Sequence, residues 1–474
     1  MTTAPPTRAS VGLRSERGPI LLALMLSTAL VALDATILST AVPSIVADLG
    51  GFSAFPWLFS AYLLAQAVSV PLYGKLSDMI GRKPIMLIGV GLFLLGSLLC
   101  GLAWSMPALI AFRALQGIGA GAIQPMSITI AGDIYTVAER AKTQGYLASV
   151  WGISSVVGPT LGGLFSDFVT WRAIFFVNVP LCLLVAFLLQ RNFTETVHGS
   201  KQKIDYAGAA LLAVGTALLI LGLLEGGTAW EWLSPAGVGI FVAAALVFVA
   251  FVLVERRAAS PVLPLWVLSR RVLLSTSLVS AAVGVITLGV TSYLPTFAQT
   301  VLGSTALVAG FAVAAMTLGW PVSASLSGRF YLRIGFRSTG FIGAGLVLLG
   351  TALTILLGTG SNVWQIAVFC VIIGAGMGLV ATPTLIRAQA SVEWNERGVV
   401  SSTNFFARNI GSSIGVAVFG AIVNASVGSG EVRPADLAVG VRSVCVALAV
   451  VAVGMLVAVW FMPKDEKPAK VAKA

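Results

Sequence analysis

The sequence predicts an all-α integral membrane protein with 14 transmembrane helices, arranged as two six-helix pseudo-repeat bundles plus two inserted helices. The first observation is composition: 57% of the 474 residues are hydrophobic and the mean hydropathy is +0.97, which excludes a soluble globular protein. The second is that apolar residues form runs of about 20, enough to cross a hydrocarbon core of about 30 Å. The third is a charged loop that begins at Gly74 and recurs at Gly328.

The expected spans follow one another with short polar loops between them. They lie at about 20–47, 55–76, 84–104, 106–131, 143–166, 173–190, 205–224, 235–254, 272–299, 305–327, 339–358, 362–385, 399–424 and 438–462. With the N-terminus in the cytoplasm, 24 of the 29 Lys and Arg residues fall on the cytoplasmic side, as the positive-inside rule requires. We therefore expect a multi-pass protein of the plasma (inner) membrane with both termini cytoplasmic.

A second repeat fixes the expected domain organisation. Three glycines and a proline of the fourth run recur in the twelfth, where Gly117, Gly119, Gly121 and Pro125 correspond to Gly374, Gly376, Gly378 and Pro383. Parallel six-helix repeats around a midplane site are one of the recurring transporter architectures. We expect a cytoplasmic tail at 1–19, a six-helix bundle at 20–190, a linker with two additional spans at 191–270, a second six-helix bundle at 271–462 and a cytoplasmic tail at 463–474.

The repeated loop places an acid among bases between two apolar runs. Its first copy runs from Gly74 to Pro84 and holds Lys75, Asp78, Arg82 and Lys83. The glycines Gly74 and Gly81 allow close backbone approach and a tight turn. In the second copy, which ends at Arg337, Leu332 takes the place of Asp78.

Several motifs in the same order give the chain a resemblance to the fourteen-span drug:proton antiporters of the major facilitator superfamily. The motifs are the loop Gly74–Pro84, Leu33–Ile37 with Pro43 in span 1, Arg113–Gly117 in span 4, the glycine-rich run from Trp151 to Gly163 in span 5, and Trp171 with Arg172 at the start of span 6. The usual asparagine after Ile37 is replaced by Ser39. The resemblance implies a proton-coupled antiporter that exports lipophilic small molecules or drugs from the cytoplasm by alternating access. An exporter of an endogenous lipid or metabolite on the same scaffold is the alternative.

Only three charges lie more than four residues from the ends of the expected spans: Asp34, Arg113 and Arg408. A charge at the bilayer centre costs about 2.5–3.5 kcal/mol on insertion scales, so each is expected to face a wet cavity or a partner. Asp34 is the only acid among them and is the candidate proton carrier; alternatively it is a static partner of Arg113 or caps a broken helix. Arg113 either tunes Asp34 or ties spans 1 and 4 together. Arg408, the third candidate for proton coupling, either faces the cavity or extends to cytoplasmic water.

The loop after span 2 is expected to act as a gate. The resemblance implies that Asp78 meets the cytoplasmic N-terminus of span 13 near Val399, where an anion is favourable. It also implies that Arg82 pairs with Asp133, with Arg140 nearby. Ordinary positive-inside charges are the alternative, and this alternative accounts well for Lys75 and Lys83.

The glycine-rich run of span 5 contains Gly152, Gly158, Pro159, Gly162 and Gly163. Small residues along one helix face permit close helix packing, and a proline interrupts the helical hydrogen bonds. The resemblance associates this run with antiporters, which favours outward transport. Plain helix packing is the alternative.

Candidate substrate contacts are polar or aromatic residues within the spans: Thr36, Tyr62, Gln66, Gln116, Gln124, Trp151, Phe297, Trp320 and Asn404. No acid lies in the last six spans. We therefore expect neutral, zwitterionic or monocationic lipophiles rather than dications as substrates.

Other functions find little support in the sequence. The single histidine, His198, lies in a loop, and no Cys/His cluster or phosphate-binding loop is present, so we expect no enzyme, no metal site and no cofactor other than the proton gradient. The net charge of +11 comes from bases in short loops, which argues against nucleic acid as a partner. The expected partners are the lipid bilayer, small lipophilic substrates and protons, and we expect a monomer.

Overall fold

The structure, a computed structural model, describes residues 11–50, 57–195, 205–227, 229–258, 261, 263, 266–427 and 434–464. Its regular structure is helical apart from one isolated bridge between Gly226 and Trp230. The first group of helices comprises α1 (Gly18–Leu49), α2 (Trp57–Ile80), α3 (Arg82–Gly101), α4 (Met106–Ile134), α5 (Val137–Phe168), α6 (Ala173–Phe176) and α7 (Asn178–Asn192). Two helices follow, α8 (Tyr206–Glu225) and α9 (Pro235–Glu255).

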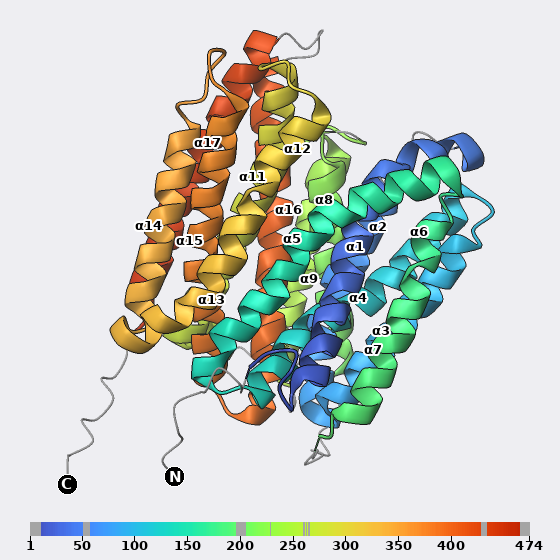
Figure 1. Cartoon of the computed structure of the whole chain (residues 1–474), viewed down its shortest axis with the longest axis vertical. Helices are drawn as coiled ribbons and strands as arrows, with labels where there is room; N and C mark the ends of the chain where they lie inside the picture. Colours follow the sequence, from blue (N-terminus) through green and yellow to red (C-terminus); the bar gives the residue numbers. More distant parts are fainter. Residues whose placement is uncertain are drawn as a thin grey trace.

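The second group begins after the short helix α10 (Trp266–Ser269). It comprises α11 (Arg271–Thr300), α12 (Ala306–Ala314), α13 (Met316–Ile334), α14 (Phe336–Thr354), α15 (Val363–Ala390), the 3₁₀ turn η2 (Trp394–Glu396), α16 (Arg397–Val427) and α17 (Pro434–Phe461). The two groups lie side by side, with α1 starting and α17 ending at the same, lower end of Figure 1.

The all-helical membrane architecture agrees with the sequence prediction. Within the described residues, 12 segments are long and apolar enough to cross a membrane. Two of the fourteen expected spans fall outside these 12, namely α2 and α8. The apolar part of α8 is the shorter stretch Ala207–Leu223, and α2 carries Gln66, Ser69 and an internal Pro71.

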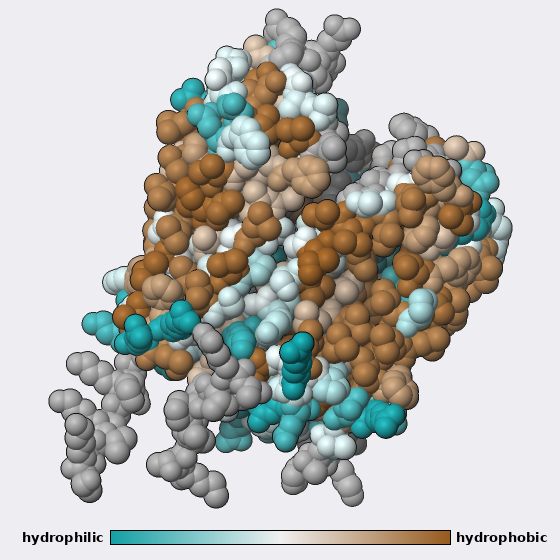
Figure 2. All heavy atoms as spheres, in the orientation of Figure 1, coloured by the Kyte–Doolittle hydropathy of each residue, from teal (hydrophilic) through white to brown (hydrophobic). Residues whose placement is uncertain are grey.

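Apolar side chains cover the outside of the molecule as well as its interior. Figure 2 shows hydrophobic residues over the flanks of both groups and hydrophilic residues towards the two ends, most densely at the lower end. On α9, for example, Leu246, Val249 and Leu253 are all more than half exposed. Because water would penalise such a surface, these flanks fit contact with lipid.

Two charged turns are built alike, one in each group. Gly81 (φ 100°) joins α2 to α3, and Gly335 (φ 88°) joins α13 to α14. Residues with a side chain rarely adopt this left-handed backbone, which explains the glycine in each turn. The corresponding helices therefore reverse direction at the same point of the repeated loop.

Glycines also bring α4 and α15 into close contact with their neighbours. A Cβ atom at Gly117 would collide with the backbone of Tyr62 on α2, and one at Gly374 would collide with the backbone of Met316 on α13. The two helices thus use corresponding glycines to approach corresponding partners, as small residues commonly do in membrane proteins.

The pair α8–α9 packs against both groups. A hydrophobic cluster joins Val70 of α2, Leu212 of α8, Phe251 of α9 and Phe406 of α16. On this face α8 therefore lies against the junction between α2 of the first group and α16 of the second.

Candidate functional site

A cavity of about 200 Å³ lies between the two groups of helices. It is lined by Thr28, Gln124, Ile128, Gln144, Leu147, Ala148, Trp151, Ser280, Val283, Thr287, Thr317, Trp320, Pro321, Ala381, Thr382, Leu385, Asn404, Phe405 and Arg408. These residues come from α1, α4 and α5 of the first group and from α11, α13, α15 and α16 of the second. The cavity is therefore shared by both groups, and a relative movement of the groups would change its shape.

Four of the nine predicted substrate contacts line this cavity: Gln124, Trp151, Trp320 and Asn404. Arg408 also lines it, with its Cζ 5.3 Å from the centre of the Trp320 ring. Of the two interpretations of Arg408, the structure therefore agrees with the one in which its side chain faces the cavity.

The other five predicted contacts do not line this cavity in this conformation. Thr36 donates a hydrogen bond to the carbonyl of Ser154 (3.0 Å) in the seam between α1 and α5. Phe297 is buried in the core of the second group, and Gln66 is half-buried on α2. The remaining two, Tyr62 and Gln116, belong to the cluster around Asp34. A uniformly apolar helix carries no sequence signal for which face meets the cavity, so the sequence could not separate these five residues from the four that line it.

Asp34 and Arg113 form an ion pair buried between helices. Arg113 Nη1 lies 2.6 Å from Asp34 Oδ2, and each side chain is 1% exposed. Arg113 also donates from Nε to the carbonyl of Leu58 (3.1 Å), and its Cζ lies 4.2 Å from the centre of the Tyr62 ring. In this conformation Asp34 meets the partner considered for it and does not face the cavity.

Gln116 completes the coordination of this pair. Its Nε2 donates to Asp34 Oδ1 and to Ser97 Oγ, both at 2.8 Å, and its Oε1 accepts from Arg113 Nη1 at 2.7 Å. Both carboxylate oxygens of Asp34 thus have donors. Such full satisfaction is what a buried ion pair requires to be tolerated.

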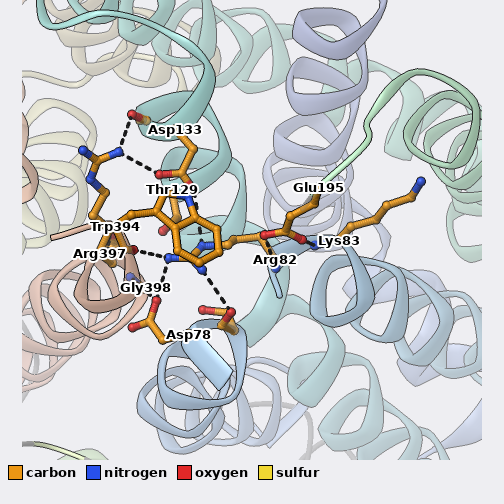
Figure 3. A network of polar contacts seen from close by, with 12 residues as sticks. Asp78, Arg82, Lys83, Thr129, Asp133, Glu195, Trp394, Arg397 and Gly398 are labelled. Carbon is orange, nitrogen blue, oxygen red and sulfur yellow. Dashed lines mark hydrogen bonds and ion pairs between the residues drawn. The ribbon is translucent and has the colours of Figure 1, made fainter. Parts of the chain in front are cut away.

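A second polar network joins the two groups at their lower end (Figure 3). Asp78 accepts hydrogen bonds from the backbone N–H of Gly398 (2.9 Å) and Val399 (2.8 Å). These N–H groups belong to the first turn of α16, where a carboxylate offsets both the unpaired donors and the helix dipole. The contact between Asp78 and the expected helix end is present.

Arg82 links Asp78 to the rest of this network. Its side chain is fully buried, with Nη2 2.8 Å from Asp78 Oδ1 and Nε 3.2 Å from Asp133 Oδ2. Its guanidinium also lies over the Trp394 ring, 3.7 Å from the ring centre, and donates to the Trp394 carbonyl. Arg82 therefore contacts two acids of the first group and the η2 turn before α16.

Three contributors to this network were not predicted: Glu195, Trp394 and Arg397. Glu195 accepts from the backbone N–H of Arg82 and of Lys83, both at 2.9 Å, at the start of α3. Arg397 Nη1 lies 2.9 Å from Asp133 Oδ1. All three lie in loops or at a helix start far along the chain from their partners. The tryptophan and the charges in these loops were the available signals.

The other predicted gate residues support the same region in different ways. A Cβ at Gly74 would collide with Ser402 of α16, so the glycine lets α2 approach that helix. Lys83 Nζ donates to the carbonyls of Gln190 (3.0 Å) and Phe193 (2.6 Å), within its own group. Arg140 donates to the carbonyls of Tyr135 and Gly132. Lys83 and Arg140 thus brace the first group rather than cross to the second.

The glycine-rich run of α5 packs on both sides. Gly152 lies close to the carbonyl of Thr317 on α13, and Gly158 lies close to Thr36 on α1. Gly162 is buried, whereas space is open around Gly163. The side chain of Pro159 lies outside the described part of the structure. Through this run α5 approaches a helix of each group.

The opposite end of the first group carries an exposed ion pair. Arg172 Nη1 lies 2.7 Å from Asp48 Oδ2, and Trp171 Nε1 donates to the same oxygen at 3.0 Å. These hydrogen bonds, that from Arg172 first, lower the pKa of Asp48 below its ordinary value. Asp48 is therefore ionised at neutral pH, and its contact with Arg172 is lost only as the pH falls through that lowered pKa.

Comparison with known proteins places these features in a family. The family model of the Major Facilitator Superfamily matches residues 24–416. Multidrug resistance protein 3 of Bacillus subtilis (strain 168) is 37% identical over 404 residues, covering 85% of this chain and 79% of the relative. Multidrug transporter protein MdtP of the same strain is 34% identical, covering 88% of this chain and 77% of the relative.

A fungal relative and a solved structure extend the comparison. Efflux pump dotC of Dothistroma septosporum (strain NZE10 / CBS 128990) is 33% identical, covering 84% of this chain and 70% of the pump. The crystal structure of the human organic anion transporter MFSD10 (TETRAN) has a TM-score of 0.66 at 16% identity, covering 94% of this chain and 99% of that one. This last likeness concerns the fold alone. The superfamily predicted from the sequence motifs is thus confirmed, and the chain is a multi-pass membrane protein that belongs to the Major Facilitator Superfamily.

Proposed function

We propose that this protein is a proton-coupled antiporter that exports lipophilic small molecules from the cytoplasm by alternating access. The relatives named as multidrug transporters and efflux pumps support drug efflux. The observation that carries the proposal is the buried Asp34–Arg113 pair on α1 and α4, because the same two helices also line the cavity, through Thr28 and Gln124.

This shared position supplies a route for coupling. Thr28 precedes Asp34 by less than two helical turns, about 9 Å along the axis. A substrate that displaces α1 or α4 therefore disturbs the ion pair. Because an uncompensated buried charge costs about 3–5 kcal/mol, Asp34 takes up a proton when Arg113 moves away and releases it when Arg113 returns.

The proposal requires a second conformation, because Asp34 is 1% exposed in this one. Here the second polar network, which we call the Asp78 network and which comprises Asp78, Arg82, Asp133, Glu195, Trp394, Arg397 and the first turn of α16, holds the lower ends of the two groups together. We assign that end to the cytoplasm and the network to a gate that opens when the groups rock apart. Water then reaches Asp34 in one of the alternating states.

The available driving force is sufficient for export. One charge that crosses 100 mV supplies about 2.3 kcal/mol, and each tenfold concentration gradient requires about 1.4 kcal/mol. No carboxylate lines the described cavity, which disfavours dications as substrates.

The finer topology is part of the proposal. We propose fourteen spans, with α2 and α8 added to the 12 apolar segments, two pseudo-symmetric six-helix bundles, and α8–α9 inserted between them. The plasma membrane, cytoplasmic termini and a monomeric state complete the proposal, with no cofactor besides the proton gradient. An exporter of an endogenous lipid or metabolite on the same scaffold is the second candidate, because the apolar cavity lining suits such molecules equally.

Asp34→Asn tests the coupling. In proteoliposomes with a pH-sensitive dye, we expect addition of 2-naphthoate or tetraphenylphosphonium to release protons from the wild type, and we expect the variant to lose this release while it still binds the compound. Asp48→Asn is the matched control, because Asp48 lies on the same helix but at its exposed C-terminal end. This variant should behave as the wild type. Undiminished proton release from Asp34→Asn would contradict the assignment of Asp34 as the carrier.

A further inference from the structure

Arg408 stands apart from the other charges in the membrane-spanning helices. Asp34 and Arg113 satisfy each other, whereas Arg408 forms no ion pair with any residue of the described chain and its guanidinium donates no hydrogen bond to them. Its one specific neighbour is the Trp320 ring, 5.3 Å from Cζ to the ring centre. Arg408 nevertheless lines the central cavity.

The cavity offers this cation no counter-charge. The remaining polar residues of the lining are uncharged amides and hydroxyls, among them Gln124, Gln144 and Thr382. The amide of Asn404 already forms hydrogen bonds within the protein: its Oδ1 accepts from Ser280 Oγ (2.8 Å) and its Nδ2 donates to the Val400 carbonyl (3.0 Å). A guanidinium at membrane depth is costly unless an anion or water satisfies it.

The lining of the same cavity also contains three aromatic rings. Trp151 comes from α5, Trp320 from α13 and Phe405 from α16, three residues before Arg408 in the chain. Such rings bind flat apolar bodies, and a planar guanidinium binds carboxylates through two parallel hydrogen bonds. The cavity volume of about 200 Å³ is below the range of about 300–1,000 Å³ for drug-sized ligands, which favours a small body.

We propose that the preferred cargo is a small lipophilic monoanion, with its carboxylate or sulfonate bound to Arg408 and its aromatic body packed against Trp151, Trp320 and Phe405. This inference rests on the proposed function. This narrows the substrate class in a direction that the sequence alone did not indicate, because the carboxylate that would attract a cation, Asp34, is already neutralised by Arg113.

The charge of such a cargo agrees with the direction of transport. Exchange of one inward proton for one outward monoanion moves two charges, both in the direction that a negative-inside potential favours. Each contributes about 2.3 kcal/mol per 100 mV. Export of the anion therefore gains from the membrane potential as well as from the pH gradient.

Three probes of nearly the same shape test the inference. Isothermal titration calorimetry of the full chain in phosphatidylcholine nanodiscs would compare 2-naphthoate, the neutral 2-naphthamide and cationic 2-naphthylmethylammonium, with empty nanodiscs subtracted. We expect the anion to bind about 10- to 100-fold more tightly than the amide, because bonds to a charged group strengthen binding by this order. Equal affinities, or tightest binding of the ammonium, would overturn the inference.

Substitutions then assign the preference to one side chain. Arg408→Gln should remove the advantage of the anion and leave the amide unchanged, whereas Arg408→Lys should retain part of it. Arg329→Gln removes one positive charge from an exposed position on α13 outside the cavity, so it should retain the full preference. Persistence of the preference in Arg408→Gln would contradict the inference. If that variant does not fold, the three-probe comparison on the wild type still decides.

The two proposals fail separately. Binding of 2-naphthoate through Arg408 without proton exchange in proteoliposomes would refute the antiport and leave the binding preference intact. Proton exchange with tetraphenylphosphonium, but no preference for the anion in the calorimeter, would refute the preference and leave the antiport intact.

Discussion

At the scale of single residues, the protein treats its buried charges in two ways. Asp34, Arg82 and Arg113 each have partners of opposite charge within 3.2 Å, so their desolvation is offset by pairing. Arg408 is left to face the cavity. The paired charges are satisfied within the protein, whereas the charge of Arg408 is available to a ligand.

Asp78 is the residue whose removal should open the lower end. Asp78→Asn loses the ion pair with Arg82 and the charged cap on α16. A carboxylate at a helix N-terminus contributes about 0.3–1 kcal/mol, and up to about 2 when partly buried, so the ratio of closed to open molecules should fall about 2- to 30-fold. Spin labels at Arg191→Cys and Leu332→Cys, one in each group, would report longer distances by double electron–electron resonance.

The control for this measurement lies at the opposite end of the molecule. Asp48→Asn also removes a carboxylate that pairs with an arginine, but within the first group only, and it should leave the distance distribution unchanged. An unchanged distribution in Asp78→Asn itself would mean that the Asp78 network does not hold the groups together.

Some residues of the candidate site could be predicted from the sequence and others could not. The contacts of Asp78, Arg82 and Asp133 could be predicted because the loop Gly74–Pro84 resembles a known family motif. Glu195 and Trp394 could not be predicted, because their contacts depend on where loops more than 100 residues away return. The same limit applies to Tyr62 and Phe297, since the sequence pattern of an aromatic residue in an apolar helix is the same whether the residue faces a cavity or a core.

At the scale of helices, glycine positions decide which neighbours meet. Gly117→Ala and Gly374→Ala would each place a methyl group against the backbone of an adjacent helix, Tyr62 in one group and Met316 in the other. Overpacking of this kind costs about 1–3 kcal/mol. We expect both variants to show lower melting temperatures in detergent by differential scanning fluorimetry.

Gly91→Ala is the matched substitution for this experiment. Nothing lies within 4 Å of a Cβ at Gly91 on α3, and alanine favours a helix over glycine by about 1 kcal/mol. This variant should be as stable as the wild type or more so. Equal loss of stability in all three variants would show that helix packing is not the reason for Gly117 and Gly374.

Helix positions were predictable because long apolar runs leave little choice of structure in a membrane. The predicted boundaries agree with α3 and α9 to within a few residues. The breaks between α6 and α7 and between α12 and α13 were not predicted, since the apolar run continues through both. The span count also exceeds the 12 apolar segments, because α2 carries polar residues and the apolar stretch of α8 is short.

At the scale of the whole molecule, the proposed orientation can be tested directly. Leu233, between α8 and α9, is 91% exposed at one end, and Glu393, between α15 and α16, is exposed beside the Asp78 network. A membrane-impermeant maleimide should label Leu233→Cys in intact cells and Glu393→Cys only in inverted vesicles. The four native cysteines are buried and should contribute little background. Labelling of Glu393→Cys in intact cells would reverse the proposed orientation.

The place of α8 makes the two long sides of the molecule unequal. On one side the junction of α2 and α16 lies under α8, held by the apolar contacts of Leu212 with its neighbours. On the other side α5 and α13 pack directly against each other, and among the described residues neither α8 nor α9 packs closely against this pair. For a molecule that diffuses within the lipid, α8 thus covers the approach between α2 and α16. We expect such a molecule to enter the cavity from the other side, between α5 and α13.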